Sequence, residues 1–98
     1  PVCLNRSTYE LVWGKRLCPL SGKEYQILEM LMQKPGVFIS AEQLVTHIWG
    51  WNAEVDTSVV WVHISNIRKK MEKLGAPVRI RFMRDAGYIV EEAPEERT

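Results

Sequence analysis

With 98 residues, 46% of them hydrophobic and 26% charged, the chain is long enough for one globular domain with a single modest core. The formal net charge is only +1, and no apolar run approaches the roughly 20 residues that a membrane-spanning helix needs. The N-terminus lacks the basic region and apolar run of a signal peptide, and because it begins with Pro1 we interpret the chain as a fragment of a longer protein. We therefore expect a cytoplasmic domain that does not contact a membrane.

Cys3 and Cys18 are the only cysteines. A disulfide scaffold of this length normally carries about four or more, so we expect both thiols to be reduced. The two histidines, His47 and His63, have no further ligand at metal-binding spacing. We expect no metal site and no cofactor.

The first twenty residues alternate β-favouring runs with turn signals. The candidate strands are residues 2–4, 9–13 and 16–20. In the middle run Tyr9, Leu11 and Trp13 fall on one face, which predicts a small antiparallel sheet packed on the core through that side. Pro19 fits only an edge strand or a strand end.

Two helices follow, and each opens with a capping box. Ser21 with Glu24 predicts a helix over residues 22–33, ended by Pro35 and Gly36. A short extended run, residues 37–39, precedes the second capping box, Ser40 with Gln43. That second helix runs to Gly50.

A third, longer helix is predicted to begin after the loop of residues 51–55, with Asp56, Thr57 or Ser58 as its N-cap. One of its faces carries apolar side chains spaced by three and four residues: Val60, Ile64, Ile67, Met71 and Leu74. This spacing predicts a stripe buried against the core.

The face turned away from this stripe is polar and becomes basic toward its C-terminal end: Val59, Val62, His63, Asn66, Lys69, Lys70 and Lys73. Such a helix is suited to the DNA major groove. An ordinary amphipathic helix with a solvated basic face has the same pattern.

Residues 78–83 and 88–91 predict two strands joined by a turn at 84–87, with Val78, Ile80 and Phe82 on one side of the first strand. Between His63 and Arg84 seven cations stand against one acid, Glu72: Arg68, Lys69, Lys70, Lys73, Arg79, Arg81 and Arg84. If all seven faced one surface, about four to six phosphates could be neutralised, and the log–log salt dependence of DNA binding would have a slope of roughly −4 to −5.

Two helices joined by a short connection, the second of which presents its outer face, form a helix-turn-helix-like unit. A hairpin that follows such a unit is a wing. The fold class is therefore α+β: a winged helix-turn-helix with an N-terminal antiparallel sheet, three helices and a C-terminal β-hairpin wing. We assign residues 1–92 to this domain and expect residues 93–98 to be a disordered, charged tail.

The order and spacing of several short motifs resemble the DNA-binding effector domain of the OmpR/PhoB family of bacterial response regulators. The motifs are Leu20-Ser21-x-x-Glu24-Tyr25-x-x-Leu28, Ser40-x-Glu42-Gln43-Leu44, Ile48-Trp49-Gly50, Val60-x-Val62-His63-Ile64-x-x-Ile67-Arg68-Lys69-Lys70-Met71 and Arg84-x-x-Gly87-Tyr88. The resemblance implies a four-stranded N-terminal sheet, a third helix in the major groove and a wing on the adjacent minor groove. It also implies transcription regulation in a two-component or orphan system.

By position, the resemblance implies base or groove contacts at Val59, Val62, His63, Asn66 and Arg84. It implies phosphate contacts at Trp49, Ser58 and Arg68, to which their charge adds Lys69, Lys70, Lys73, Arg79 and Arg81. It assigns the loop of Trp51, Asn52, Ala53, Glu54 and Val55 to contact with RNA polymerase. The further partners it implies are a receiver domain outside these residues and a second copy, forming a dimer on direct-repeat DNA half-sites.

The chain departs from the usual family pattern at several positions. Ala41 replaces an Arg, Ser58-Val59 an Arg-Thr pair, Trp61 an Asp, Ser65-Asn66 a basic pair and Asp85 a Gly. Together these changes remove positive charge from the start of the third helix. We expect Trp61 to pack against the second helix or the loop before it.

No nucleophile elbow, phosphate-binding glycine loop or HExxH motif is present, so we expect no enzymatic activity. The alternative function is a winged-helix protein-interaction module whose basic face binds an acidic partner, or an anionic membrane surface, instead of DNA.

Overall fold

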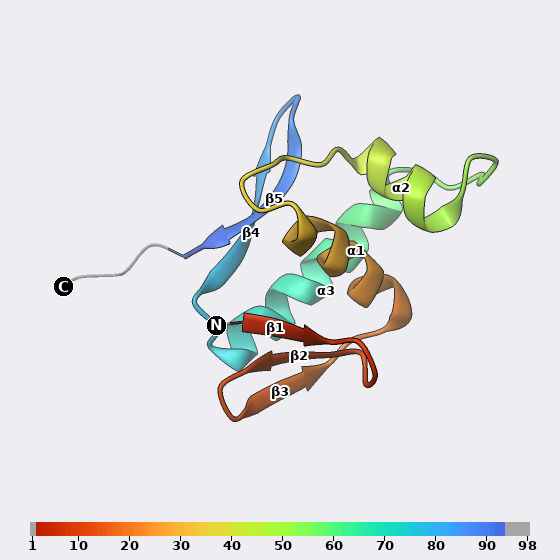
Figure 1. Ribbon diagram of the computed structural model, residues 1–98. Helices are drawn as coiled ribbons and strands as arrows, with labels where there is room; N and C mark the ends of the chain where they lie inside the picture. The colour runs from red at the N-terminus through yellow and green to blue at the C-terminus, as the bar shows by residue number, and fades with distance from the viewer. Residues whose placement is uncertain (1, 94–98) are drawn as a thin grey trace.

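The computed structural model describes residues 2–93, and its elements follow the predicted order (Figure 1). They are β1 (Val2–Asn5), β2 (Glu10–Trp13), β3 (Arg16–Pro19), α1 (Gly22–Gln33), α2 (Ala41–Trp49), α3 (Ser58–Leu74), β4 (Val78–Met83) and β5 (Gly87–Glu92). The α+β winged-helix prediction is confirmed.

The N-terminal sheet is antiparallel in the order β1-β2-β3, so β2 is its central strand. Leu11 of β2 is fully buried, and Pro19 ends the edge strand β3, as predicted. The resemblance implied a four-stranded sheet; within residues 2–93 this sheet has three strands. Cys3 and Cys18 lie on opposite faces of the sheet, which excludes a bridge between them.

Tyr9 differs from its prediction. It precedes β2 in a left-handed backbone conformation, with φ 57°, and so does not continue the face of Leu11 and Trp13. Its ring stacks on Tyr25 of α1, with the two ring centres 4.6 Å apart. The residue therefore connects the β1–β2 turn to α1.

Both capping boxes form. The Ser21 hydroxyl accepts from the Glu24 amide, and the Glu24 carboxylate accepts from the Ser21 amide. Ser40 and Gln43 make the same reciprocal pair at the start of α2. Because these bonds satisfy backbone amides that a helix start leaves free, they place both helix starts where the sequence predicts them.

The five residues of the predicted apolar stripe of α3 are all buried in the core, between α3 and the other elements. Thr57 occupies the N-cap position without a side-chain capping bond, whereas the carboxylate of Asp56 accepts from the Ser58 amide at 2.8 Å. Hydrogen bonds from the Ser58 backbone and side chain hold the pKa of Asp56 below its ordinary value. Asp56 thus performs the capping function one residue early.

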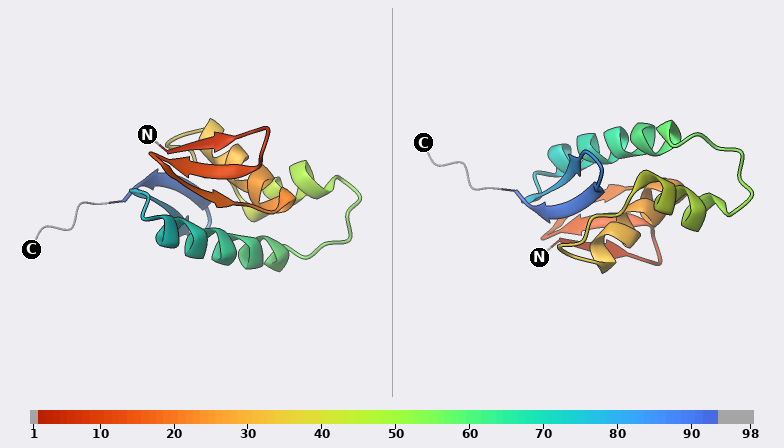
Figure 2. Two further views of the ribbon diagram at one scale, coloured as in Figure 1. Left: turned by 90° about the horizontal axis from the view of Figure 1, so that it is seen from below. Right: turned by 90° about the horizontal axis from the view of Figure 1, so that it is seen from above.

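In both views of Figure 2, α3 runs along one side of the molecule, so one long face of the helix is uncovered. The hairpin β4–β5 lies beside its C-terminal half, and β4 contacts α3 while β5 contacts α1. The uncovered face and the hairpin are therefore neighbouring parts of one surface.

The wing is also attached to the connection between α1 and α2. Ile39 and Tyr88 exchange two backbone hydrogen bonds of 2.8 Å, which confirms the extended conformation predicted there. Gly87 has φ 116°, and a Cβ at this position would lie 2.3 Å from the Ile39 carbonyl oxygen. Only glycine fits this approach.

The second strand of the wing is longer than the predicted residues 88–91. Glu92 belongs to β5, and the Ala93 amide donates to the Pro77 carbonyl at 3.0 Å, so Ala93 is held to the start of β4. The remaining part of the predicted tail, residues 94–98, lies outside the described residues. Within residues 2–93 no helix is both long and apolar enough to cross a bilayer.

Candidate nucleic-acid interface

One narrow ridge of α3 points directly away from the core. It consists of residues spaced by four, four, three and four, all of them exposed, and we call it the outer ridge: Ser58, Val62, Asn66, Lys69 and Lys73. Val62 keeps 51% of its surface exposed although it is apolar. The first half of the outer ridge is uncharged and the second half is cationic, as the sequence predicts.

A second part of the predicted reading face turns toward the other helices instead. Val59 packs partly against the core, and the ring of His63 lies 5.7 Å from the ring of Trp49 in α2. The Nδ1 atom of His63 is buried and has no hydrogen-bond partner within residues 2–93. Val59 and His63 therefore border the outer ridge on the side of α2.

Lys70 is used inside the fold. Its ammonium group lies 2.5 Å from the carboxylate of Glu24 in α1, and Glu24 is 4% exposed. Burial disfavours the ionised Glu24, but hydrogen bonds from Lys70 and Ser21 outweigh that cost and hold the pKa of Glu24 below its ordinary value. The expectation that Lys70 shares a surface with the other cations is wrong, because a buried acid of α1 lies within its reach.

Trp49, predicted to contact phosphate, is half-buried and has a cation above its ring. The Lys23 ammonium of α1 lies 5.1 Å from the centre of that ring, within the range of a cation–π interaction. Lys23 thus adds positive charge at the end of α2, where the Trp49 ring contacts His63 of α3. Nothing in the local sequence indicates this, because the contact joins two different helices.

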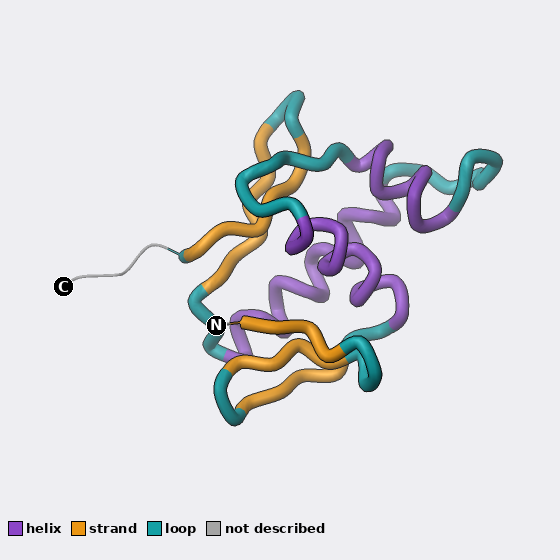
Figure 3. Tube along the Cα trace, in the orientation of Figure 1, coloured by secondary structure: helices purple, strands orange, loops and turns teal. Residues whose placement is uncertain are grey.

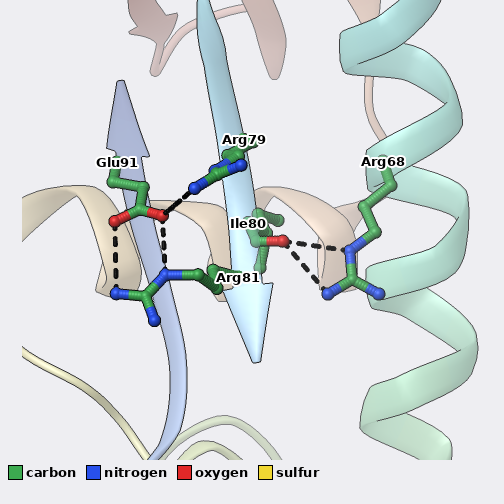
Figure 4. A network of polar contacts seen from close by, with 5 residues as sticks. All are labelled: Arg68, Arg79, Ile80, Arg81 and Glu91. Carbon is green, nitrogen blue, oxygen red and sulfur yellow. Dashed lines mark hydrogen bonds and ion pairs between the residues drawn. The ribbon is translucent and has the colours of Figure 1, made fainter. Parts of the chain in front are cut away.

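The opposite flank of α3 faces the wing, and Arg68 makes the connection (Figure 4). Its Nε and Nη2 atoms donate to the Ile80 carbonyl of β4 at 3.2 and 3.0 Å. The guanidinium group is therefore held in one orientation between helix and hairpin. Two of its five N–H donors are used in this way.

Trp61 lies on this same flank, so the expectation that it packs against α2 or the preceding loop is wrong. Together with Arg68, Phe82 and Tyr88 it lines a hollow of about 240 Å³ between α3 and the wing. Its side chain remains largely in solvent. Its place on the helix, seven residues before Arg68, puts it on that flank, between the buried stripe and the outer ridge.

Arg79 and Arg81 form a cluster with Glu91 on the neighbouring strand (Figure 4). Arg79 donates at 3.0 Å and Arg81 at 2.7 Å to the same oxygen, and these two arginines hold the pKa of Glu91 below its ordinary value, Arg81 first. Alternation along β4 places them on the hairpin face opposite Phe82. The seven cations therefore do not all face one surface.

Arg84 is exposed in the turn of the wing and has no hydrogen-bond or ion-pair partner within residues 2–93. Asp85 beside it adopts the left-handed conformation, with φ 69°, that glycine adopts most easily. The cations that remain available near the outer ridge and the wing are Lys23, Arg68, Lys69, Lys73 and Arg84.

The arrangement of an uncovered helix face beside a wing agrees with the family that the sequence matches. A family model described as "Transcriptional regulatory protein, C terminal" matches residues 14–90. The chain belongs to this family. It is an OmpR/PhoB-type effector domain of a response regulator, a DNA-binding family of transcription regulators rather than a family of enzymes.

One relative of this effector domain is the heme response regulator HssR of Staphylococcus aureus (strain JH9). The two are 39% identical over 88 residues, which cover 90% of this chain and 39% of HssR. The chain thus spans well under half the length of the curated relative that it matches.

Two solved structures that are similar to this domain are DNA-binding domains in complex with DNA. The AdeR domain in complex with an intercistronic region has a TM-score of 0.78 and 25% identity, covering 95% of each chain. The Klebsiella pneumoniae RstA domain in complex with the RstA box has a TM-score of 0.72 and 26% identity, covering 96% of this chain and 92% of that one.

The loop between α2 and α3 of this effector domain projects from the end of the molecule where α3 begins (Figure 3). Trp51 is 91% exposed there, and Asn52 and Glu54 are also exposed. Ala53 and Val55 are half-buried, and Val55 packs against the core. Three residues of the predicted polymerase loop are thus exposed to solvent, and the other two are partly buried.

Proposed function

We propose that this domain binds double-stranded DNA sequence-specifically as the output domain of a two-component or orphan transcription regulator, with α3 in the major groove and the wing on the adjacent minor groove. The observation that carries the proposal is the outer ridge on the uncovered face of α3. Its side chains are short and uncharged in the first half and cationic in the second, and it lies beside a wing that presents Arg84.

Base reading falls to the first half of the outer ridge. The carboxamide of Asn66 can pair with both the donor and the acceptor that adenine shows in the major groove, and Val62 can pack on the methyl group of thymine. Val59 and His63 border this contact on the side of α2. Arg84 of the wing reads the minor groove.

Phosphate contacts come from the cations that the fold leaves available, from Ser58 at the start of α3 and from Trp49 at the end of α2. Lys70, Arg79 and Arg81 are engaged by Glu24 and Glu91, which lowers the number of phosphates that the domain neutralises. With about four phosphates neutralised, the log–log salt slope becomes roughly −3.6 per domain. This slope lies at the shallow end of the range that the sequence alone predicts.

The proposed partners follow from the same family membership. Two copies occupy direct-repeat half-sites about one helical turn apart. The loop of Trp51, Asn52 and Glu54 contacts RNA polymerase, and a receiver domain elsewhere in the same cytoplasmic protein controls the output. The partial coverage of HssR supports the presence of such a further domain.

The test is selection of bound duplexes from a random pool, followed by anisotropy titrations of the selected and a scrambled duplex over a range of salt. We expect saturable binding, a preference for the selected duplex and the salt slope given above. Asn66→Ala should reduce the preference by about 1–3 kcal/mol, mainly at one base pair. Absence of duplex binding at modest salt contradicts the proposal and favours an acidic protein partner for the basic face.

A further inference from the structure

The hollow between α3 and the wing is an aromatic feature on a surface otherwise described by charge. Trp61 and Phe82 are 58% and 54% exposed, although large apolar side chains are usually buried. Phe82 also contacts the ring of Tyr88, with ring centres 5.1 Å apart. Two exposed aromatic rings flanking one hollow indicate a contact site.

The polar chemistry of the hollow indicates an anionic occupant. Among residues 2–93, Arg68 is the only charged residue that lines it, and no acidic side chain of these residues does. The Ile80 carbonyl accepts from two of the N–H donors of Arg68, so the other donors are held in a set direction and less side-chain entropy is lost when they bind. The ligand that fits has an apolar face for the rings and an anionic group for the guanidinium.

The location of the hollow indicates that this ligand is the DNA backbone. Under the proposed function, α3 and the wing occupy adjacent grooves, and a single sugar–phosphate strand separates two adjacent grooves. The hollow lies between these two elements. A deoxyribose has an apolar face that can pack on the rings. Its phosphate carries a negative charge that can pair with the guanidinium group of Arg68.

We propose that Trp61 and Phe82 form an aromatic clamp that packs on the deoxyribose of the strand between the two grooves, while Arg68 donates to the phosphate of that nucleotide. This inference rests on the proposed function. The clamp supplies affinity that is neither ionic nor sequence-dependent, because every nucleotide presents the same sugar. It offsets part of the affinity that is lost because Ser58 and Ser65 carry no positive charge.

The clamp has a distinct signature in a salt titration. Trp61→Ala and Phe82→Ala should each weaken binding about tenfold, to selected and scrambled duplexes alike, with the log–log salt slope unchanged. Trp61→Phe, which keeps an aromatic ring, should retain most of the affinity. Leu17→Ala is the matched control, because it removes a comparably exposed large apolar side chain, 57% exposed, from β3 outside the hollow and should leave the affinity for DNA unchanged.

Two further measurements distinguish the loss of a DNA contact from misfolding of a variant. Thermal melts of each variant establish that the domain is folded, and Trp61 itself reports contact in the unaltered domain. Its burial on DNA should shift tryptophan emission to shorter wavelength. Because Trp49 is also proposed to contact DNA, this shift should be clearly smaller, and not absent, in Trp61→Phe, and it should be unchanged in Leu17→Ala.

Several outcomes overturn the clamp while leaving the proposed function intact. They are unaltered affinity in a folded Trp61→Ala variant, a loss confined to the selected duplex, or a change in salt slope. Sedimentation showing that Trp61→Ala breaks an association of the free domain overturns it too, since the hollow is then a protein contact. Failure of the unaltered domain to bind any duplex overturns the proposed function itself, and the clamp with it.

Discussion

The ammonium group of Lys70 lies 2.5 Å from the carboxylate of Glu24, which is almost completely buried between α1 and α3. Its sequence neighbour Lys69 is on the outer ridge and exposed. Two adjacent lysines of one helix therefore have different roles, one in packing and one on the surface proposed to bind DNA.

The first prediction separates these roles. Lys70→Met should lower the free energy of unfolding by about 2 kcal/mol, because it leaves Glu24 buried without its cation, and should leave the salt slope of DNA binding unchanged. Lys69→Met should do the reverse, reducing the slope by about 0.9 with little effect on stability. Urea denaturation at neutral pH and anisotropy titrations measure the two effects. Equal effects of both variants on the salt slope would contradict the assignment.

The second prediction concerns acid stability. Because the pKa of folded Glu24 lies below its ordinary value of 4.5, ionised Glu24 stabilises the fold above that pH, and the contribution is lost as pH falls through the folded pKa. Asp56 and Glu91, whose pKa values are also lowered, act in the same direction. Glu24→Gln should therefore be less stable than the unaltered domain at neutral pH but lose less stability on acidification. Urea denaturation at a series of pH values tests this, and parallel curves for the two proteins would refute it.

The third prediction concerns the turn of the wing. Asp85→Gly removes a side chain from a left-handed backbone position and a negative charge from beside Arg84, so we expect stability to rise by up to about 1 kcal/mol and DNA affinity to rise several-fold at low salt. Asp85→Asn is the control, because it removes the charge and tolerates the same backbone. It should reproduce the gain in affinity and little of the gain in stability. A weaker-binding Asp85→Gly variant would show that the carboxylate contributes a favourable contact.

The fourth prediction concerns the attachment of the wing to residue 39. Gly87→Ala places a methyl group against the Ile39 carbonyl and should cost about 3 kcal/mol or more, seen as a lower melting temperature. Gly36→Ala is the matched control, since Gly36 also has a positive φ but nothing lies within 4 Å of its added Cβ. We expect only about 1 kcal/mol there. Similar losses for both variants would mean that backbone strain alone, and not the close approach, makes Gly87 necessary.

Much of the fold could be predicted from the sequence because its signals are local. Each capping box fixes a helix start through groups three residues apart, and Ser21 and Ser40 opened α1 and α2 where expected. The stripe of α3 was predictable for the same reason, since helical spacing alone decides which side chains share a face.

The partners of the charged groups could not be predicted, because they come from other elements. Lys70 and Lys69 look alike in the sequence, and only the packing of α1 against α3 brings Glu24 to one of them. Glu91, an acid near the end of the chain, neutralises the two wing arginines because the hairpin register places it opposite Arg79. The neighbours of Trp61 could not be predicted for the same reason, because Phe82 and Tyr88 come from the hairpin.

The bridge between Ile39 and Tyr88 has a consequence for synthesis of the chain. At roughly 5 to 20 residues per second, the ribosome completes Ile39 several seconds before it adds Tyr88 and β5. During that interval the amide and carbonyl of Ile39 lack the bonds that they make in the finished domain, and the core is open on the side that β5 will cover. Any product released before β5 is made lacks this closing strand and is a ready substrate for proteases. The core of this domain is thus covered only when β5 has been made.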